Sequence, residues 1–344
     1  MESEESVKND YEVLQTMSAR AALTRVILGA ALVLLLGGGC KQPESDVPRA
    51  VADEITAARD RADQQPNSPD AWVALGQTCL EAEMYNDAYI AFKQGWALDQ
   101  KQPEALHGLA EASLQLHNPQ AARTWVNKAL ALNPRDGDAL GMRGEVKLAE
   151  EDVAGARSDL MAASRLGPLR LTSSLALTAV YMRQGHKDLA LAQAEKTSHR
   201  FPLEATAHHN YAVLLDQLGR GKEAEDEYRL ALECNPRALR DKLLLAQVLV
   251  RSSRNLDEAR KLALEVAAKA PGNGTPAAVA ARALYLKGQR EQSLKELLEV
   301  QSQYRTNPLV LFWIYDEAKA TGNTEIEKAA AEVLQRLLST QDRR

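Results

Sequence analysis

The stretch ATAHHNYAVLLDQLGRGKEAEDEYRLALECNP, residues 205–236, is one copy of a unit that recurs along this chain every 34 residues. Two residue types keep that interval. The alanines are Ala88, Ala122, Ala156, Ala190 and Ala224, and the prolines are Pro134, Pro168, Pro202 and Pro236. A register this strict is very improbable by chance, and a period of 34 residues indicates a helical repeat array.

Each unit has the residues that a pair of antiparallel helices needs. Small residues at the eighth and twentieth positions let the two helices approach closely where they cross. Those at the eighth position are Gly76, Ala110, Gly144, Ala212 and Ala246. Proline near the thirty-second position cannot donate a backbone hydrogen bond, so it separates one unit from the next. Glycines suit the left-handed turn between the two helices, and they are Gly185, Gly219, Gly288 and Gly322. The sequence therefore predicts an all-α fold.

The units resemble the tetratricopeptide repeat (TPR). The first unit has the pattern W-x2-L-G and two later matches, at Trp72, Leu75, Gly76, Ala88 and Phe92. The fifth unit matches at Tyr211, Ala212, Leu215, Ala224, Tyr228, Ala231 and Pro236. Cys79 and Gln100 stand where the family usually has a tyrosine and the closing proline. The resemblance covers about residues 69–307 and implies a right-handed superhelical solenoid of about seven repeats plus capping helices.

The register divides the chain. We expect units to start near Pro69, Pro103, Gly137, Leu171, Ala205, Leu239 and Gly274. An amphipathic helix over Arg49–Gln64, within residues 49–68, should cover one end of the core. A partial repeat and cap at 308–344 should cover the other, because terminal repeats shield the core from water. The aromatic residues Phe312, Trp313 and Tyr315 fit that cap.

The N-terminal segment has the layout of a secretory signal. Arg20 and Arg25 precede an apolar run over 26–36, and small residues lead into Cys40. The end of this segment resembles the lipobox of bacterial lipoproteins, although Gly37 stands where a leucine is usual. The resemblance implies a signal peptide within 1–39, lipidation of Cys40 and a polar tether over 40–48. It also implies a place in the bacterial cell envelope, facing the periplasm.

Two alternatives to a lipoprotein follow from the first residues. Residues 1–16 are acidic, which is unusual for a signal, and translation from Met17 would restore an ordinary lipoprotein signal. If Met1 is the start, an uncleaved signal anchor that holds a single-pass regulatory adaptor becomes the alternative. The apolar run is short for a membrane span, which needs about 20 residues. A soluble cytosolic protein is the third possibility.

Composition and motifs disfavour other function classes. A net charge of -5 and a pI near 5.8 give no sign of a nucleic-acid-binding surface. The histidines His107, His117, His186, His199, His208 and His209 show no metal-binding spacing, and no nucleotide loop or nucleophile motif occurs. We therefore predict no metal, no cofactor and no enzymatic activity. Cys79 and Cys234 should be buried thiols too far apart to form a disulfide.

What remains is the binding of a protein or peptide partner. In the TPR family, positions 2, 5, 9 and 12 of each first helix line a concave groove. The resemblance thereby nominates Gln77, His107, Glu111, Met182, His209, Gln247 and Arg282. The alternative for each is an ordinary solvated side chain. We expect a scaffold or adaptor that serves envelope assembly, a pilus, secretion or exopolysaccharide export. Charge reversal at Arg282 or Glu111 should alter partner capture without lowering stability.

Overall fold

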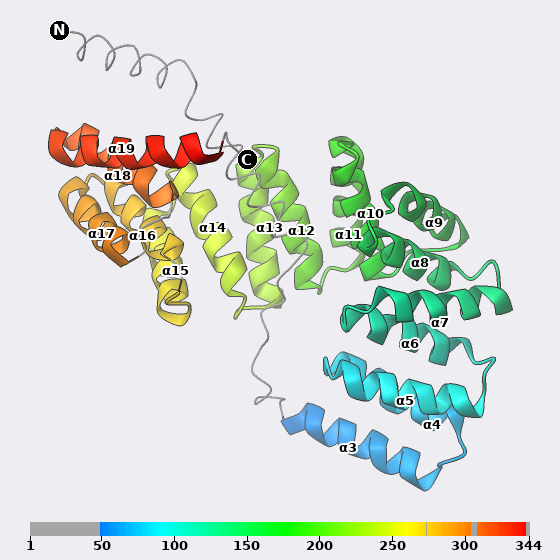
Figure 1. Cartoon of the computed structure of the whole chain (residues 1–344). Coiled ribbons are helices and arrows are strands. Elements are labelled where there is room, and N and C mark those ends of the chain that lie inside the picture. Colours follow the sequence, from blue (N-terminus) through cyan, green and yellow to red (C-terminus); the bar gives the residue numbers. More distant parts are fainter. Residues whose placement is uncertain (1–48, 273, 304–307, 342–344) are drawn as a thin grey trace.

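The computed structural model describes residues 49–272, 274–303 and 308–341, and every regular element in these ranges is an α-helix (Figure 1). Helix α3 spans Arg49–Gln64 and packs against α4. The other helices form eight antiparallel pairs: α4 Pro69–Glu81 and α5 Tyr85–Leu98, α6 Pro103–Gln115 and α7 Pro119–Leu132, α8 Gly137–Ala149 and α9 Val153–Leu166, α10 Leu171–Arg183 and α11 Lys187–Arg200, α12 Ala205–Gln217 and α13 Gly221–Cys234, α14 Leu239–Arg251 and α15 Leu256–Lys269, α16 Thr275–Leu286 and α17 Arg290–Gln303, α18 Pro308–Thr321 and α19 Thr324–Gln341. The predicted all-α solenoid is confirmed.

The helix starts follow the repeat register. The first helix of each pair begins at the predicted residue, except that α16 begins one residue later, at Thr275. Proline occupies the start of α4 and α6, where its missing N–H costs nothing. The Ser68 hydroxyl accepts a hydrogen bond from the backbone N–H of Ala71, over 3.3 Å, and caps α4.

Left-handed residues join the two helices of each pair. The four predicted glycines have φ of +75°, +76°, +88° and +73° and are Gly185, Gly219, Gly288 and Gly322. The first three pairs use Glu83, His117 and Glu151 instead, with φ of +60°, +56° and +66°. The turn geometry is therefore the same where the glycine is missing, at the steric cost of a Cβ atom.

Small residues permit the close helix crossings. The five alanines of the ladder, Ala88, Ala122, Ala156, Ala190 and Ala224, are all 0% exposed. The ring of Phe92 lies over two glycines, because a Cβ atom added at Gly76 would be 2.8 Å from it and one added at Gly108 only 2.4 Å. Large and small residues thus interlock across successive pairs.

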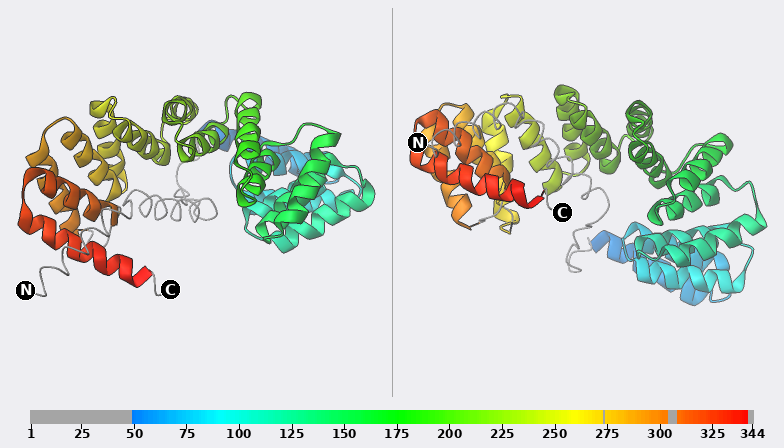
Figure 2. Two further views of the ribbon diagram at one scale, coloured as in Figure 1. Left: turned by 90° about the horizontal axis from the view of Figure 1, so that it is seen from above. Right: turned by 45° about the horizontal axis from the view of Figure 1, so that its top comes forward.

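The solenoid is curved, and the first helices lie on its inner side. The backbones of neighbouring first helices lie close together along most of the array, α12 and α14 excepted, whereas neighbouring second helices lie farther apart and meet through long side chains. The shorter path around a curved stack is the inner one. Figure 2 shows the resulting arch, with α3 to α9 on one arm and α14 to α19 on the other.

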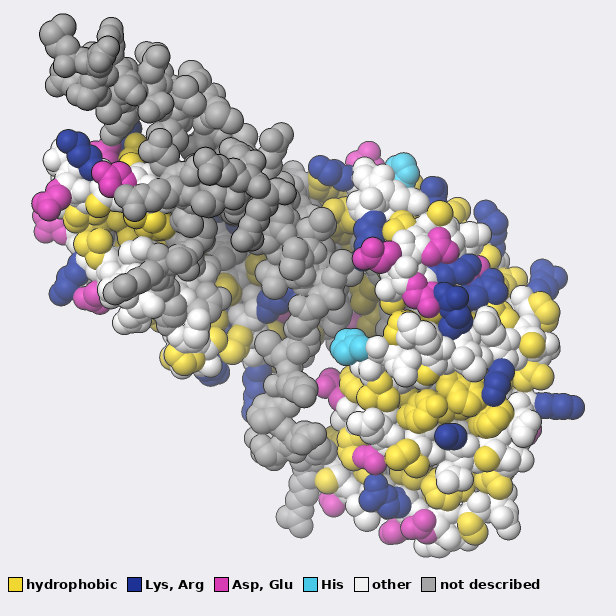
Figure 3. All heavy atoms as spheres, viewed as in Figure 1, with side chains coloured by type: hydrophobic (Ala, Val, Ile, Leu, Met, Phe, Trp, Pro, Cys, Tyr) yellow, Lys and Arg dark blue, Asp and Glu magenta, His cyan; other side chains and the backbone are white. Residues whose placement is uncertain are grey.

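The core is continuous within each arm and narrows in the middle. One cluster of buried side chains extends from Ile55 to Ala163, and another from Ala190 to Ala283. A small cluster on α9 and α10, with Leu160 and Leu177, lies between them. At the C-terminal end a fourth cluster extends from Ala278 to Ala330, and Trp313 packs against both this cluster and the one from Ala190 to Ala283, as expected for a cap. The outer surface carries charges of both signs, with hydrophobic side chains gathered over α5 and α7 (Figure 3).

The predictions for the N-terminal segment cannot be compared with the described residues, and one of the two predictions for the repeat cysteines is wrong. The signal region, Cys40 and the tether lie outside the described ranges. Within those ranges, no helix is long and apolar enough to cross a membrane. Cys79 is a buried free thiol whose pKa is raised by that burial. The prediction for Cys234 is wrong, because this free thiol ends α13, is only half-buried and lies 3.7 Å from the Pro202 carbonyl oxygen.

Candidate protein-binding groove

The inner face of the arch is built from the first helices, α4, α6, α8, α10, α12, α14, α16 and α18. Along each of these helices, positions 2, 5, 9 and 12 share one face because of the helical period. The residues nominated from the sequence occupy these positions. The structure brings four of the seven into contact with a later pair rather than with solvent alone.

Two nominated residues in α6 form polar contacts to later pairs. His107 Nε2 lies 2.8 Å from Asp136 Oδ2, and the same aspartate caps α8 through its other oxygen. Glu111 forms an ion pair with Arg170, which precedes α10 and therefore lies two pairs farther along the array. These residues hold consecutive first helices in register.

Two nominated residues in later pairs, on α12 and α16, do the same. His209 Nδ1 contacts the buried carboxylate of Asp241. Arg282 donates to Asp316 Oδ2 over 2.8 Å and to Glu317 Oε1 over 3.2 Å, and Glu317 is 0% exposed. Burial raises the pKa of Glu317 above its ordinary value, and the hydrogen bonds and charge of Arg282 oppose that shift. Removing the Arg282 guanidinium would therefore leave the Glu317 carboxylate buried without its ion-pair partner.

These contacts correct one expectation. Arg282 and Glu111 each form ion pairs with residues of another repeat, so charge reversal at either position should lower stability instead of sparing it. The sequence could not reveal this, because each partner lies in another repeat. The groove positions without such contacts lie on a different part of the inner face.

The side chains of the remaining nominated residues make no hydrogen bond among the described residues. Gln77 is exposed near the N-terminal end of the groove, and Gln247 is half-buried in α14. Met182 is half-buried and packs at the edge of the second core cluster. Around it, groove positions of three successive first helices carry half-buried apolar side chains, which we call the apolar strip: Leu175, Ala179, Met182, Val213 and Leu243.

A polar cluster that the site prediction did not include borders the strip. Ser173 and Thr172 donate to Glu145 Oε1, over 2.6 Å and 3.0 Å. Burial raises the pKa of Glu145, and the Ser173 hydrogen bond and nearby Arg170 oppose this rise. Glu145 holds position 9 of α8, which is one of the groove positions of the family pattern.

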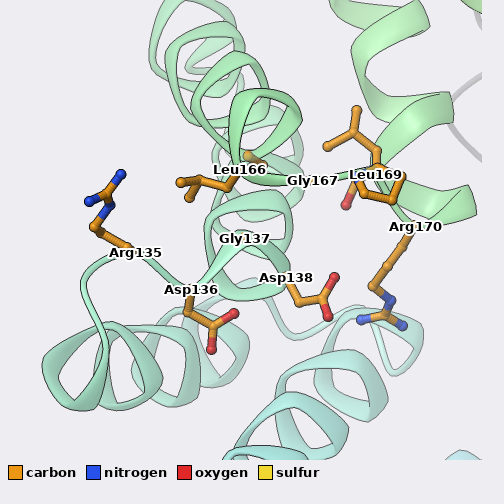
Figure 4. Close-up of a pocket in the computed structure, with 11 residues that line it drawn as sticks. Arg135, Asp136, Gly137, Asp138, Leu166, Gly167, Leu169 and Arg170 are labelled. Atoms are coloured by element: carbon orange, nitrogen blue, oxygen red, sulfur yellow. The ribbon is translucent and has the colours of Figure 1, made fainter.

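A pocket of about 370 Å³ opens beside this cluster, between the start of α8 and the loop from α9 to α10. Figure 4 shows the side chains of Asp138 and Arg170 pointing toward one another across it, while Arg135 points away. Asp136 also lines the pocket, but its two oxygens are taken by the α8 cap and by His107. The polar groups that line the pocket thus mainly stabilise the junction of the third and fourth pairs. No group of His, Cys, Asp or Glu within the described ranges could hold a metal ion.

Comparisons with known proteins agree with this architecture. Two tetratricopeptide repeat models match residues 80–146 and 176–238. No curated protein matches the chain. The chain therefore contains tetratricopeptide repeats in these two stretches, and its helical-repeat fold is that of TPR scaffolds for protein interactions.

Solved structures with the same fold come from distant proteins. Cut9 in the APC/C hetero-tetramer Cut9-Hcn1 has 16% identity and a TM-score of 0.58, and the match covers 68% of this chain but only 46% of that one. PilF of Pseudomonas aeruginosa has 21% identity and a TM-score of 0.51, over 60% of this chain and 94% of that one. PilW, a type IV pilus biogenesis factor, has 16% identity and a TM-score of 0.50, over 60% and 96%. At these identities the likeness shows the fold alone.

Proposed function

We propose that this protein is a membrane-anchored TPR scaffold that holds an apolar segment of a partner protein against the apolar strip. The observation that carries the proposal is the contrast along the groove. On either side of the strip, and at His209 between its helices α12 and α14, polar side chains are occupied by contacts between repeats. The five residues of the strip have no such duty beyond partial packing.

The shape of the strip indicates the kind of partner. It runs across α10, α12 and α14, so its ligand must contact successive helices along the arch. An amphipathic helix or an extended segment with spaced apolar residues satisfies this geometry. Because the neighbouring polar groups are already paired, apolar contact supplies the binding free energy, and the polar rim fixes the position of the segment.

The N-terminal sequence supports the anchor. The segment ending at Cys40 has the layout of a lipoprotein signal, and only a short tether separates it from α3. Two acyl chains on a mature N-terminal cysteine would hold the protein stably on a membrane. PilF and PilW share the fold, and the latter is described as a pilus biogenesis factor, so envelope or pilus assembly is the process we propose.

Site-specific photo-crosslinking in cells tests the groove. A photoreactive amino acid at Leu175 or at Leu243 should capture the same discrete envelope protein, because both positions face one groove. The matched controls are Leu230 and Leu264, which are exposed leucines on the second helices α13 and α15. Capture from the controls and not from the strip would refute the groove as the binding site. The substitution Leu175→Asp should abolish capture from Leu243 as well.

Metabolic labelling with a fatty acid tests the anchor separately. The wild-type protein should be labelled and Cys40→Ala should not. Unchanged labelling of the variant would rule out lipidation at this cysteine. Retention of an N-terminal tag on the mature protein would instead support the uncleaved signal anchor.

A further inference from the structure

An aromatic cluster lies on the outer side of the first two helix pairs. The rings of Trp96 and Trp125 meet edge to face with centroids 5.1 Å apart, and Tyr89 meets Trp125 at 6.5 Å. The Lys128 ammonium lies over both indoles, 4.1 Å and 4.3 Å from their centroids. Ile90 beside this cluster is 58% exposed. Aromatic residues make up only 5% of the chain, so this concentration is unusual for it.

Helical spacing places these side chains on one surface. Tyr89, Lys93 and Trp96 stand at i, i+4 and i+7 of α5, and Lys128 follows Trp125 by three residues in α7. Together we call Tyr89, Ile90, Lys93, Trp96 and Lys128 the outer patch. Hydrophobic side chains with Lys or Arg at their edge cover this part of the molecule in Figure 3.

The charge around the outer patch favours an anionic partner. Lys93 and Lys128 are exposed and form no ion pair with any described residue. Helix α7 has no acidic residue, and α5 has only Asp87. By contrast, α13 carries five acidic residues and two basic ones, so its outer face would be repelled by an anionic surface. Elsewhere among the described residues cations lie over single rings, as Arg282 and Arg290 do over Tyr285, whereas here Lys128 lies over two indoles that contact each other.

The position of the outer patch in the chain indicates which anionic partner it meets. Eight residues separate Cys40 from Arg49, and this stretch reaches at most about 30 Å when fully extended. Helix α3 adds 16 residues, or about 24 Å, before the first pair. A bilayer that holds Cys40 is therefore within reach of α5 and α7. Tryptophan and tyrosine gather at the level of lipid headgroups, where one end of the ring is apolar and the other wet.

We propose that the outer patch docks on the surface of a bilayer that contains anionic phospholipids. Lys93 and the outward N–H groups of Lys128 donate to lipid phosphates, and Ile90 and Trp96 insert among the headgroups. Docking on the outer side leaves the inner groove turned away from the membrane and accessible to a partner. This inference rests on the membrane anchoring proposed above, and it adds how the anchored solenoid is oriented.

Quenching of tryptophan fluorescence by brominated phospholipids tests the orientation. The full chain is incorporated from detergent into vesicles of phosphatidylethanolamine with phosphatidylglycerol, so that either a lipidated Cys40 or an uncleaved apolar segment can hold it. We expect quenching that is lost in Trp96→Phe and that falls about fivefold for each of Lys93→Glu and Lys128→Glu. Phosphatidylcholine vesicles should give the same low value for all variants.

The matched controls carry the same charge change away from the aromatic cluster. Lys222→Glu in α13 and Lys295→Glu in α17 replace exposed lysines of second helices and should leave the quenching unchanged. Circular dichroism confirms that each variant is folded. Equal losses in the controls and the patch variants would reduce the effect to net charge and overturn the proposal.

Vesicle flotation separates the two proposals. Protein that floats with the vesicles but shows no lipid quenching is anchored without docking, which overturns the outer patch alone. Protein that does not float at all overturns the anchor and the docking together. If another protein crosslinks to Trp96 and its presence prevents the quenching, the outer patch binds a protein partner. That result would likewise overturn the inference.

Discussion

The contact between Gly108 and the Phe92 ring makes a sharp test of how the repeats interlock. Gly108 lies in α6 and Phe92 in α5, so their contact joins the first pair to the second. A Cβ atom at Gly108 would stand 2.4 Å from Cε1 and Cζ of the ring and 2.5 Å from Cε2. We predict that Gly108→Ala destabilises the protein.

The magnitude follows from the packing. Carbon atoms in contact normally lie about 3.5–4.0 Å apart, so the new methyl group would overlap the ring by about 1 Å. The ring is only 1% exposed and has no space to move into. Overpacking of this kind costs about 3 kcal/mol at the upper end of the usual range. Alanine gains about 1 kcal/mol over glycine in a helix interior, which leaves a net loss of about 2 kcal/mol.

Urea unfolding of the full chain, monitored by far-ultraviolet circular dichroism, measures this difference in the free energy of unfolding. The comparison assumes that the dependence on urea concentration is the same for both proteins. Gly221→Ala is the control, because no atom lies within 4 Å of the Cβ position at that helix start. It should not lose stability. In the background Phe92→Leu, the loss caused by Gly108→Ala should shrink by about 1 kcal/mol or more, since the opposing ring atoms are gone. A Gly108→Ala variant as stable as wild type, or losses that add without coupling, would refute the reasoning.

Three further predictions use the buried polar groups. Arg282→Met should lower stability by about 1–3 kcal/mol because it leaves the buried Glu317 without its guanidinium, whereas the exposed Arg240→Met should change little; thermal unfolding compares them. Because the pKa of Glu145 is raised, the folded state binds more protons than the unfolded state as pH rises above about 4.5, so the free energy of unfolding falls over that window. Glu145→Gln should make this fall smaller, as measured by urea unfolding at a series of pH values. Tyr228 is 0% exposed and its hydroxyl has no hydrogen-bond partner among the described residues, so Tyr228→Phe should raise stability by about 1 kcal/mol; an unchanged or lower urea midpoint would count against this.

Much of the groove prediction was correct in register and incomplete in chemistry. The repeat period located the first helices to within one residue, so the nominated positions do share the inner face. It could not show that His107, Glu111, His209 and Arg282 would be occupied by contacts between repeats. Their partners lie 29, 59, 32 and 34 residues away in the chain. Of the nominated residues, Gln77, Met182 and Gln247 are free of such contacts, and Met182 belongs to the apolar strip.

The outer patch shows the same division. Each of its residues sits in an ordinary helical position, and nothing in the sequence period distinguishes Trp96 from a core residue. Only the packing of α5 against α7 brings the two indoles and Lys128 together at the surface.

The sequence by itself determined the all-α class, the length of each unit, the start of each helix pair and the buried alanine ladder. These features are local, because they depend on helix crossings and turns within one repeat or between neighbours. The tertiary structure decided which groove residues pair with one another, where the core narrows, and that Glu83, His117 and Glu151 take left-handed turns without glycine. Small rotations between repeats add up along the array, and the resulting curvature sets the distance between side chains that are far apart in the chain.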